Sequence, residues 1–222
     1  MSELRPTRIW DLPTRVFHWA LAAAVVAAVV SANVGAMVWH FRFGYCVFAL
    51  LLFRILWGFV GGRWSRFGSF LPTPGRLLRY LRGRAAPGEH LDIGHSPLGA
   101  LSVFALLAVL AVQVGTGLVG DDEISLVGPL NRFVDTATGI AATGWHKSNG
   151  KLMVIALVLL HVAAIVVYAV RGRRLVPPML TGDKLLPAGT PASADGALER
   201  VLAGVLAAAC IVFVAWVVSL GG

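Results

Sequence analysis

Histidine is the residue type in this chain that is best suited to chemistry. Four of its six histidines lie within long apolar segments or at their ends, namely His18, His40, His146 and His161. An imidazole among Leu, Val and Ala side chains has no water to bond, and an unpaired polar group there costs roughly 2–7 kcal/mol. Each ring therefore needs a partner, such as a hydrogen-bonding group on a neighbouring helix or a metal ion.

The spacing of His146 and His161 predicts where two such partners lie. In an uninterrupted α-helix, fifteen residues separate two side chains by about 22 Å along the axis and about 60° around it. A single helix would then offer two nitrogen ligands on roughly one face, one near each side of a bilayer. The partners of both histidines must come from other segments.

The composition indicates a membrane protein. Of the 222 residues 57% are hydrophobic, and the mean hydropathy is +0.77. Five apolar segments approach or exceed the length that crosses a hydrocarbon core, at residues 16–35, 39–60, 97–119, 146–170 and 201–220. The expected fold is all-α and integral to the membrane, with several spans in contact with the lipid bilayer.

The distribution of charge predicts the orientation of the spans. The net charge is +8, and Arg and Lys gather before the first span, between the second and third, and between the fourth and fifth. Asp and Glu gather between the third and fourth, at residues 121–135. The positive-inside rule then places the N-terminus in the cytoplasm and the acidic loop and the C-terminus on the opposite side. Topology accounts for the basic balance, so no nucleic-acid partner is expected.

The segment 171–198 between the fourth and fifth spans is expected to be a flexible cytoplasmic linker. It contains Pro177-Pro178 and a later run rich in Pro, Gly, Ala and Ser. His90 is expected to be a solvated surface residue in the loop that follows the second span.

Span direction groups the four histidines by depth. His40 and His146 lie at the outer ends of the second and fourth spans, whereas His18 and His161 lie toward the inner side of the first and fourth. Each pair comes from two helices, as ligation between bundle helices requires. Neutral imidazole is a common iron ligand, and haem iron with two histidines has no open position for oxygen, so it transfers electrons. His95, just before the third span, is a reserve ligand.

Two arginines inside the second span are candidates to bind a cofactor. Arg42 and Arg54 lie near the outer and inner histidine levels, where they, with Lys147, could neutralise haem propionates. For Arg54 the alternative is that it extends to the cytoplasmic headgroups. Gly44, Gly58 and Gly61 either admit a flat ligand or let helices approach closely.

Three motifs carry a resemblance to a known family. They are RIWDLPTRVFHW at 8–19, FRILWGFVG at 53–61 and GHSPLGA at 94–100, and the His146–His161 pair accompanies them. From about residue 8 to 171 the chain resembles the prokaryotic di-haem b-type cytochromes of the 561 type, which include the membrane cytochrome subunit of nickel–iron hydrogenases.

The resemblance implies a four-helix transmembrane bundle that holds two non-covalent haem b groups, to which the fifth span is added. By position, His18 and His161 would bind the inner haem, and His40 and His146 the outer one. Covalent attachment is not expected, because the two cysteines form no CxxCH motif.

The resemblance also implies the biological role. It is that of an electron-transfer subunit of a respiratory oxidoreductase in the bacterial cytoplasmic (inner) membrane, rather than a stand-alone enzyme. Electrons would pass between a periplasmic c-type cytochrome or redox enzyme and the quinone pool or another acceptor. No residue pattern marks a quinone site, and the oligomeric state is left open.

Three alternatives remain open at this level. Zinc competes for paired histidines, although structural zinc usually has four compact ligands, often with thiolates. A membrane anchor or assembly subunit without a cofactor would leave His161 to bond a neighbouring helix. A transporter that relays protons through its histidines would need a polar path, and the five segments contain no Asp or Glu.

Overall fold

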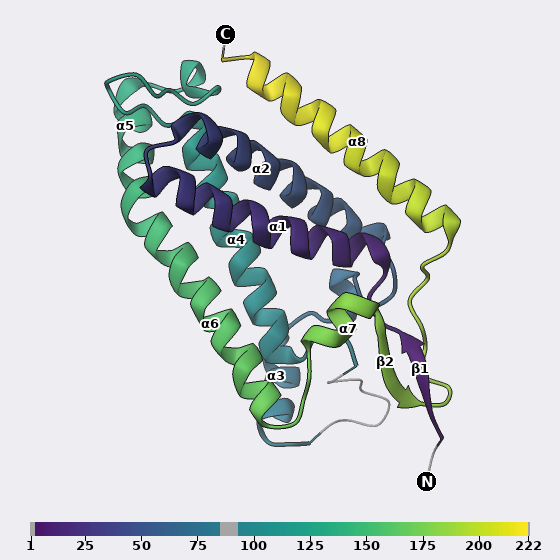
Figure 1. Cartoon of the computed structure of the whole chain (residues 1–222). Helices are drawn as coiled ribbons and strands as arrows, with labels where there is room; N and C mark the ends of the chain where they lie inside the picture. The colour runs from purple at the N-terminus through teal and green to yellow at the C-terminus, as the bar shows by residue number, and fades with distance from the viewer. Residues whose placement is uncertain (1–2, 85–92, 222) are drawn as a thin grey trace. The chain divides into compact units, whose positions relative to one another are not determined.

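The computed structural model describes residues 3–84 and 93–221 (Figure 1). His90 lies outside these residues. Within them, five helices are long and apolar enough to cross a membrane, at Leu12–Asn33, Met37–Val60, Pro97–Val119, Thr136–Val170 and Ala197–Ser219. These helices confirm the predicted class, an all-α integral membrane protein.

The chain divides into two compact units, and each of the five long helices contributes residues to both. The first unit comprises Met1–His18, Arg54–Ala105 and Leu160–Gly204. The second unit comprises Trp19–Phe53, Leu106–Leu159 and Val205–Gly222. The His18–His161 pair falls in the first unit and the His40–His146 pair in the second.

A four-helix core occupies the second unit. Buried residues from α1 (Leu12–Asn33), α2 (Met37–Val60), α4 (Pro97–Val119) and α6 (Lys151–Val170) form one cluster, made of Ala24, Val47, Leu51, Leu110 and Val154. The fifth long helix, α8 (Ala197–Ser219), contacts α2, where the ring of Phe213 lies 6.3 Å from that of Phe48. The second unit is therefore a four-helix bundle to which α8 is added.

The turn between α1 and α2 is short because one glycine adopts a left-handed conformation. Only Val34, Gly35 and Ala36 separate the two helices, and Gly35 has a φ of +74°. A residue with a Cβ would be strained there. This turn holds His40 in the first turn of α2, beside the end of α1.

The fourth membrane-spanning helix begins ten residues earlier than position 146, the start expected from sequence. Asp135 caps it by accepting a hydrogen bond from the Thr138 N–H at 2.9 Å, and the residues that follow are small or apolar. The helix consists of α5 (Thr136–Trp145), the π-helical turn η3 (His146–Gly150) and α6. Because η3 interrupts the α-helix, the 60° offset calculated for a regular helix does not apply.

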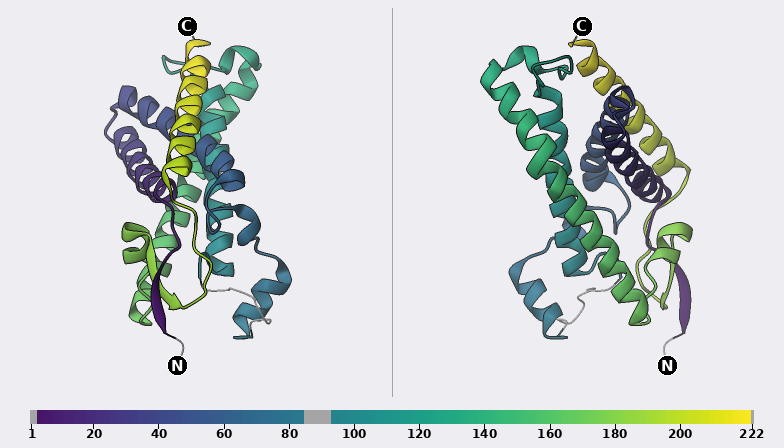
Figure 2. Two further views of the ribbon diagram at one scale, coloured as in Figure 1. Left: turned by 90° about the vertical axis from the view of Figure 1, so that its right-hand side faces the viewer. Right: turned by 60° about the vertical axis from the view of Figure 1, so that its left-hand side comes forward.

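The first unit contains a two-stranded sheet where a flexible linker was expected. After the short helix α7 (Val176–Thr181), strand β2 (Asp183–Pro187) pairs antiparallel with β1 (Leu4–Arg8), and the two strands lie side by side in both views of Figure 2. The physical reason is burial, because Leu186 of β2 is 8% exposed and packs in a cluster with Ile9, Trp10 and Trp64. Composition alone did not reveal this pairing.

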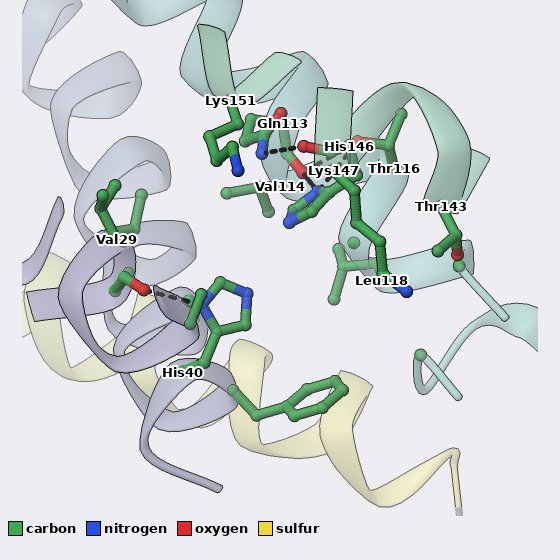
Figure 3. A pocket seen from close by; sticks show the side chains of 18 of the residues that line it. Val29, His40, Gln113, Val114, Thr116, Leu118, Thr143, His146, Lys147 and Lys151 are labelled. Atoms are coloured by element: carbon green, nitrogen blue, oxygen red, sulfur yellow. Dashed lines mark hydrogen bonds between the residues drawn. The ribbon is translucent and has the colours of Figure 1, made fainter. Parts of the chain in front are cut away.

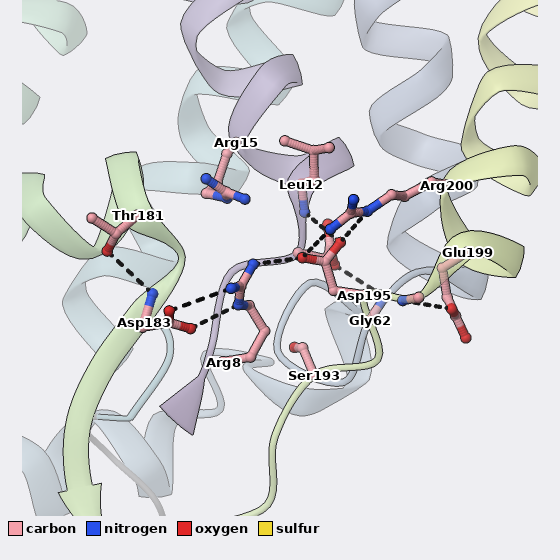
Figure 4. A network of polar contacts seen from close by, with 12 residues as sticks. Arg8, Leu12, Arg15, Gly62, Thr181, Asp183, Ser193, Asp195, Glu199 and Arg200 are labelled. Atoms are coloured by element: carbon pink, nitrogen blue, oxygen red, sulfur yellow. Dashed lines mark hydrogen bonds and ion pairs between the residues drawn. The ribbon is translucent and has the colours of Figure 1, made fainter. Parts of the chain in front are cut away.

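Ion pairs reinforce this sheet (Figure 4). The Arg8 guanidinium binds Asp183 at 2.7 Å and Asp195 at 2.6 Å, and Asp195 also accepts the Leu12 N–H at 3.0 Å and pairs with Arg200 at the start of α8. The beginnings of α1 and α8 are thus both tied to residues 183–195.

A buried carboxylate joins α1 to the end of α2. Asp11, with 0% exposure, accepts hydrogen bonds from the Thr14 N–H, the Trp57 indole, the Gly62 N–H and the Ser65 hydroxyl. Shorter helices complete the described chain: η1 (Phe67–Ser69), α3 (Pro74–Leu81) and η2 (Asn131–Phe133).

Candidate haem-binding sites

The structure brings His40 and His146 together in the second unit. Their ring centroids are 5.9 Å apart and their planes differ by 85°. Two imidazoles that bind one iron from opposite sides would have centroids roughly 6 Å apart, because each nitrogen lies about 2 Å from the metal and about 1 Å from its ring centre. The spacing therefore fits a metal held between the two rings.

Hydrogen bonds determine which nitrogen of each ring can bind a metal. His40 donates from Nδ1 to the Ala28 carbonyl, and His146 donates from Nδ1 to the Gln113 carbonyl, both at 2.9 Å. A carbonyl only accepts, so Nδ1 carries the proton and Nε2 keeps its lone pair. Such a bond is the usual outer support of a metal-ligating histidine.

A cavity of about 410 Å³ lies between these two histidines (Figure 3). Its lining is mostly apolar, with side chains from α1, α2, α4 and α6. Gly44 lies in this lining, and a Cβ there would meet nothing within 4 Å. A largely apolar cavity with a few convergent polar groups is the usual form of a cofactor site.

Two lysines supply positive charge to the cavity. Lys147 and Lys151 both line it, as Figure 3 shows. Arg42, the basic residue assigned to this level from sequence, does not line the cavity, and its guanidinium lies 4.9 Å from the centre of the Trp39 ring. Asp122 also lines the cavity, so the lining holds two basic residues and one acidic residue.

The first unit contains the second histidine pair. His18 of α1 and His161 of α6 have ring centroids 6.4 Å apart, with planes at 52°. Two helices contribute one ring each, and the separation again fits a metal between them. Nowhere in residues 3–84 and 93–221 do three or more His, Cys, Asp or Glu side chains form a metal-binding group. Each pair thus offers two nitrogen ligands, one from each of two helices.

Arg54 is a buried cation in the first unit. The residue is 3% exposed, and its guanidinium lies 4.6 Å from the centre of the Phe67 ring. Its Nη1 atom is buried and forms no hydrogen bond with any described residue. A buried guanidinium with an unused donor fits an anionic ligand such as a haem propionate, whereas extension to the headgroups would leave it exposed.

The glycines around Arg54 serve close packing. A Cβ on Gly58 would lie within 3 Å of the Phe67 ring, and a Cβ on Gly61 would lie within 3 Å of Trp57. Both positions therefore let aromatic side chains approach the α2 backbone. In the second unit Gly44 instead borders the cavity.

His95 is buried but is not one of the paired rings. Its ring lies 4.7 Å from that of Trp10 and 4.2 Å from that of Phe70. Burial, together with the positive charge of Arg54, lowers the pKa of His95 to about 3, so the ring is neutral at physiological pH. The cap of α4 is its neighbour Ser96, whose hydroxyl accepts the Gly99 N–H at 3.2 Å.

Two residues of the outer site were not identified from sequence. Lys151 lies five residues after His146, and a regular α-helix gives no reason to place both at one cavity. Gln113 contacts His146 through both its main chain and its side chain. The signal available for Gln113 was that it is the one carboxamide in the third span.

Comparison with known proteins gives one finding. Residues 9–182 match the family model described as prokaryotic cytochrome b561. No curated protein and no solved structure matches the chain. The matched range contains all four paired histidines and Arg54, so this chain belongs to the prokaryotic cytochrome b561 family, whose members are helical membrane proteins that transfer electrons through b-type haem.

Proposed function

We propose that this protein is a di-haem electron-transfer subunit of a respiratory oxidoreductase in the bacterial inner membrane. The family establishes b-type haem and electron transfer. The observation that supports two haems is that two histidine pairs, each from two helices, have ring separations of 5.9 and 6.4 Å.

The proposed axial ligands are His40 and His146 for the outer haem, and His18 and His161 for the inner one. When bound, haem b supplies an iron that exchanges one electron and, with two histidines, has no open coordination position. At the outer pair, the carbonyls of Ala28 and Gln113 hold Nδ1–H and so keep Nε2 available. The lining of the cavity around this site is largely apolar.

The cationic side chains have a separate role, which is to hold the haem carboxylates. Lys147 and Lys151 would serve the outer haem, and Arg54 would serve the inner one. Arg42 would act at longer range, since it stacks on Trp39. Charge-assisted bonds of this kind fix orientation as well as adding affinity.

The distribution of charge supports an orientation with the N-terminus in the cytoplasm and the C-terminus in the periplasm. Most of the arginines lie in the first unit, including Arg63, Arg66, Arg76, Arg79, Arg171 and Arg173. The acidic residues 121–123 lie in the second unit. The positive-inside rule assigns the first group to the cytoplasm.

The acidic loop is the proposed contact for a periplasmic redox partner, either a c-type cytochrome or a redox enzyme. The backbone N–H groups of Leu126, Ser125 and Ile124 bond Asp122 and lower its pKa. Asp122 therefore stays charged near neutral pH, and it would attract a basic partner surface. Quinone is the proposed acceptor or donor on the membrane side.

Single histidine substitutions test the two-haem assignment. His161→Ala is expected to remove the inner haem and leave the outer one, while His40→Ala should do the reverse, because each variant removes one ligand from one pair. The measurement is the haem-to-protein ratio by pyridine haemochrome, together with the reduced-minus-oxidised spectrum of each purified variant.

The outcomes separate the alternatives. If His161→Ala loses no haem, the assignment of His18 and His161 as ligands of the inner haem is wrong. If His95→Ala removes a haem that His40→Ala leaves in place, the ligand set and the topology both need revision. If the wild-type protein contains no haem after expression with ample haem supply, a membrane-anchor role replaces this proposal.

A further inference from the structure

Gln113 contacts His146 at two points. Its backbone carbonyl accepts the His146 Nδ1–H at 2.9 Å, and its side-chain Nε2 donates to the His146 carbonyl at 3.0 Å. The second contact assigns the amide orientation, since a carbonyl can only accept. One residue of α4 thus holds both the ring and the main chain of a proposed haem ligand, and Figure 3 draws both contacts.

The main-chain contact falls where the helix is irregular. His146 is the first residue of the π-helical turn η3. A π-turn replaces i→i+4 hydrogen bonds with i→i+5 bonds, and such turns are frequent at functional sites. A donor from outside the helix can add to the hydrogen bonding of such a turn. The Gln113 amide is that donor for the His146 carbonyl.

Gly150, the last residue of η3, makes room for this amide. A Cβ at position 150 would lie 2.0 Å from Gln113 Oε1 and 2.3 Å from the Trp145 ring. Alanine is otherwise favoured over glycine in a helix by about 1 kcal/mol. The close approach of Gln113 and of the Trp145 ring is therefore the physical reason for glycine at this position.

We propose that Gln113 is a positioning residue for His146, and that Gly150 is the residue that admits it. The proposal rests on the proposed function, namely that His146 Nε2 binds the outer haem. The contact to the ring fixes the rotation of the imidazole about its side-chain bonds and keeps Nδ1–H bonded to a carbonyl. The contact to the main chain holds the backbone that carries the ring. A bonded Nδ1–H makes Nε2 a stronger electron donor.

Loss of the two contacts between Gln113 and His146 should therefore affect the outer haem alone. Gln113→Leu keeps the approximate side-chain size but removes the amide donor, and Gly150→Ala displaces the amide while leaving Gln113 in the sequence. Both variants are expected to release the outer haem to excess apomyoglobin about 10- to 100-fold faster, the usual range for loss of an outer-shell partner. Both variants keep the Gln113 backbone carbonyl, but they loosen the backbone that carries the ring. The Nδ1–H bond should therefore weaken and Nε2 become a poorer donor, so that the reduction potential of that haem rises.

Matched controls distinguish loss of the Gln113–His146 contacts from general damage to the helices. Gly144→Ala makes the same change six residues earlier, where a Cβ meets nothing within 4 Å. Val112→Ala alters the exposed neighbour of Gln113. Both controls should keep the wild-type rate of haem release and the wild-type potentials.

His146→Ala distinguishes a failure of this inference from a failure of the proposed function. If His146→Ala removes one haem but Gln113→Leu and Gly150→Ala leave its release rate and potential unchanged, the positioning role is overturned and the haem site stands. If His146→Ala removes no haem, the outer-site assignment itself is wrong. A shift in both haems, or an equal shift in Gly144→Ala, would also contradict the proposal.

Discussion

In His40 and His146, the Nδ1 atom donates to a carbonyl, which leaves the Nε2 atom with its lone pair. Each Nδ1 is bonded to a carbonyl of another helix or turn, from Ala28 and from Gln113. Axial rise and span direction were sufficient to group these two histidines from sequence. Their hydrogen-bond partners were not predictable, because a backbone carbonyl carries no residue-type signal.

The two lysines of the outer cavity are expected to raise the reduction potential of the outer haem. Lys147→Gln and Lys151→Gln should each lower the reduction potential of the outer haem, because a nearby positive charge favours the reduced iron. The expected effect is on the order of 1–2 kcal/mol for a charge about 10 Å away at an effective dielectric constant of about 20. Potentiometric titration with optical detection measures it.

Arg132→Gln is the matched control for this pair. Arg132 belongs to the same unit and carries the same charge, but it does not line the cavity, since it bonds the Leu220 carbonyl and lies over Phe133. A fall in potential as large in Arg132→Gln as in the lysine variants would show a general surface-charge effect and not carboxylate binding.

At the scale of elements, capping residues decide where the helices begin. Asp11 caps α1 in a buried site, and Asp135 caps α5 in an exposed one. The early start of the fourth membrane-spanning helix follows from Asp135, whose role could have been identified from its position before a run of small residues. The π-turn could not, because one additional residue in a helical turn leaves no periodic signal in a short apolar segment.

The two caps should differ in their contribution to stability. Asp11→Ala leaves the donors of Trp57, Gly62 and Ser65 without their acceptor in a buried site, so it should destabilise the protein by about 3 kcal/mol or more. Asp135→Ala should cost about 1 kcal/mol, as for an exposed cap. Thermal unfolding of both variants in the same detergent checks the order, and equal effects would contradict the buried network.

At the scale of the whole chain, residues far apart in sequence meet in the first unit. β1 pairs with β2, and Arg8 joins Asp183 and Asp195. The five apolar spans could be predicted because hydrophobic length is a local property. The sheet could not, because it depends on pairing across about 175 residues and on a segment whose Pro and Gly content is typical of a linker.

Asp195 makes this network sensitive to acid. Burial by itself raises the pKa of Asp195. The Leu12 N–H and the guanidinium groups of Arg200 and Arg8 lower it by more than burial raises it, so the pKa lies below its ordinary value. A carboxyl with a lowered pKa in the folded state contributes stability above its unfolded pKa of about 4, and that stability is lost as the pH falls.

Asp195→Asn should therefore destabilise the protein at pH 7 by about 1–3 kcal/mol, with the difference from wild type narrowing below about pH 4. Unfolding temperatures measured from pH 7 to pH 3 test this expectation. A difference that stays constant across the range would mean that the charge of Asp195 is unimportant.

In the proposed function each chain holds two haems, each between two histidines. The most direct measurement is the haem content of the purified wild-type protein by pyridine haemochrome, combined with the reduced spectrum before and after addition of carbon monoxide. We expect two b-type haems per chain, both low-spin and both unaffected by carbon monoxide. One haem per chain, or a haem that binds carbon monoxide, would contradict it.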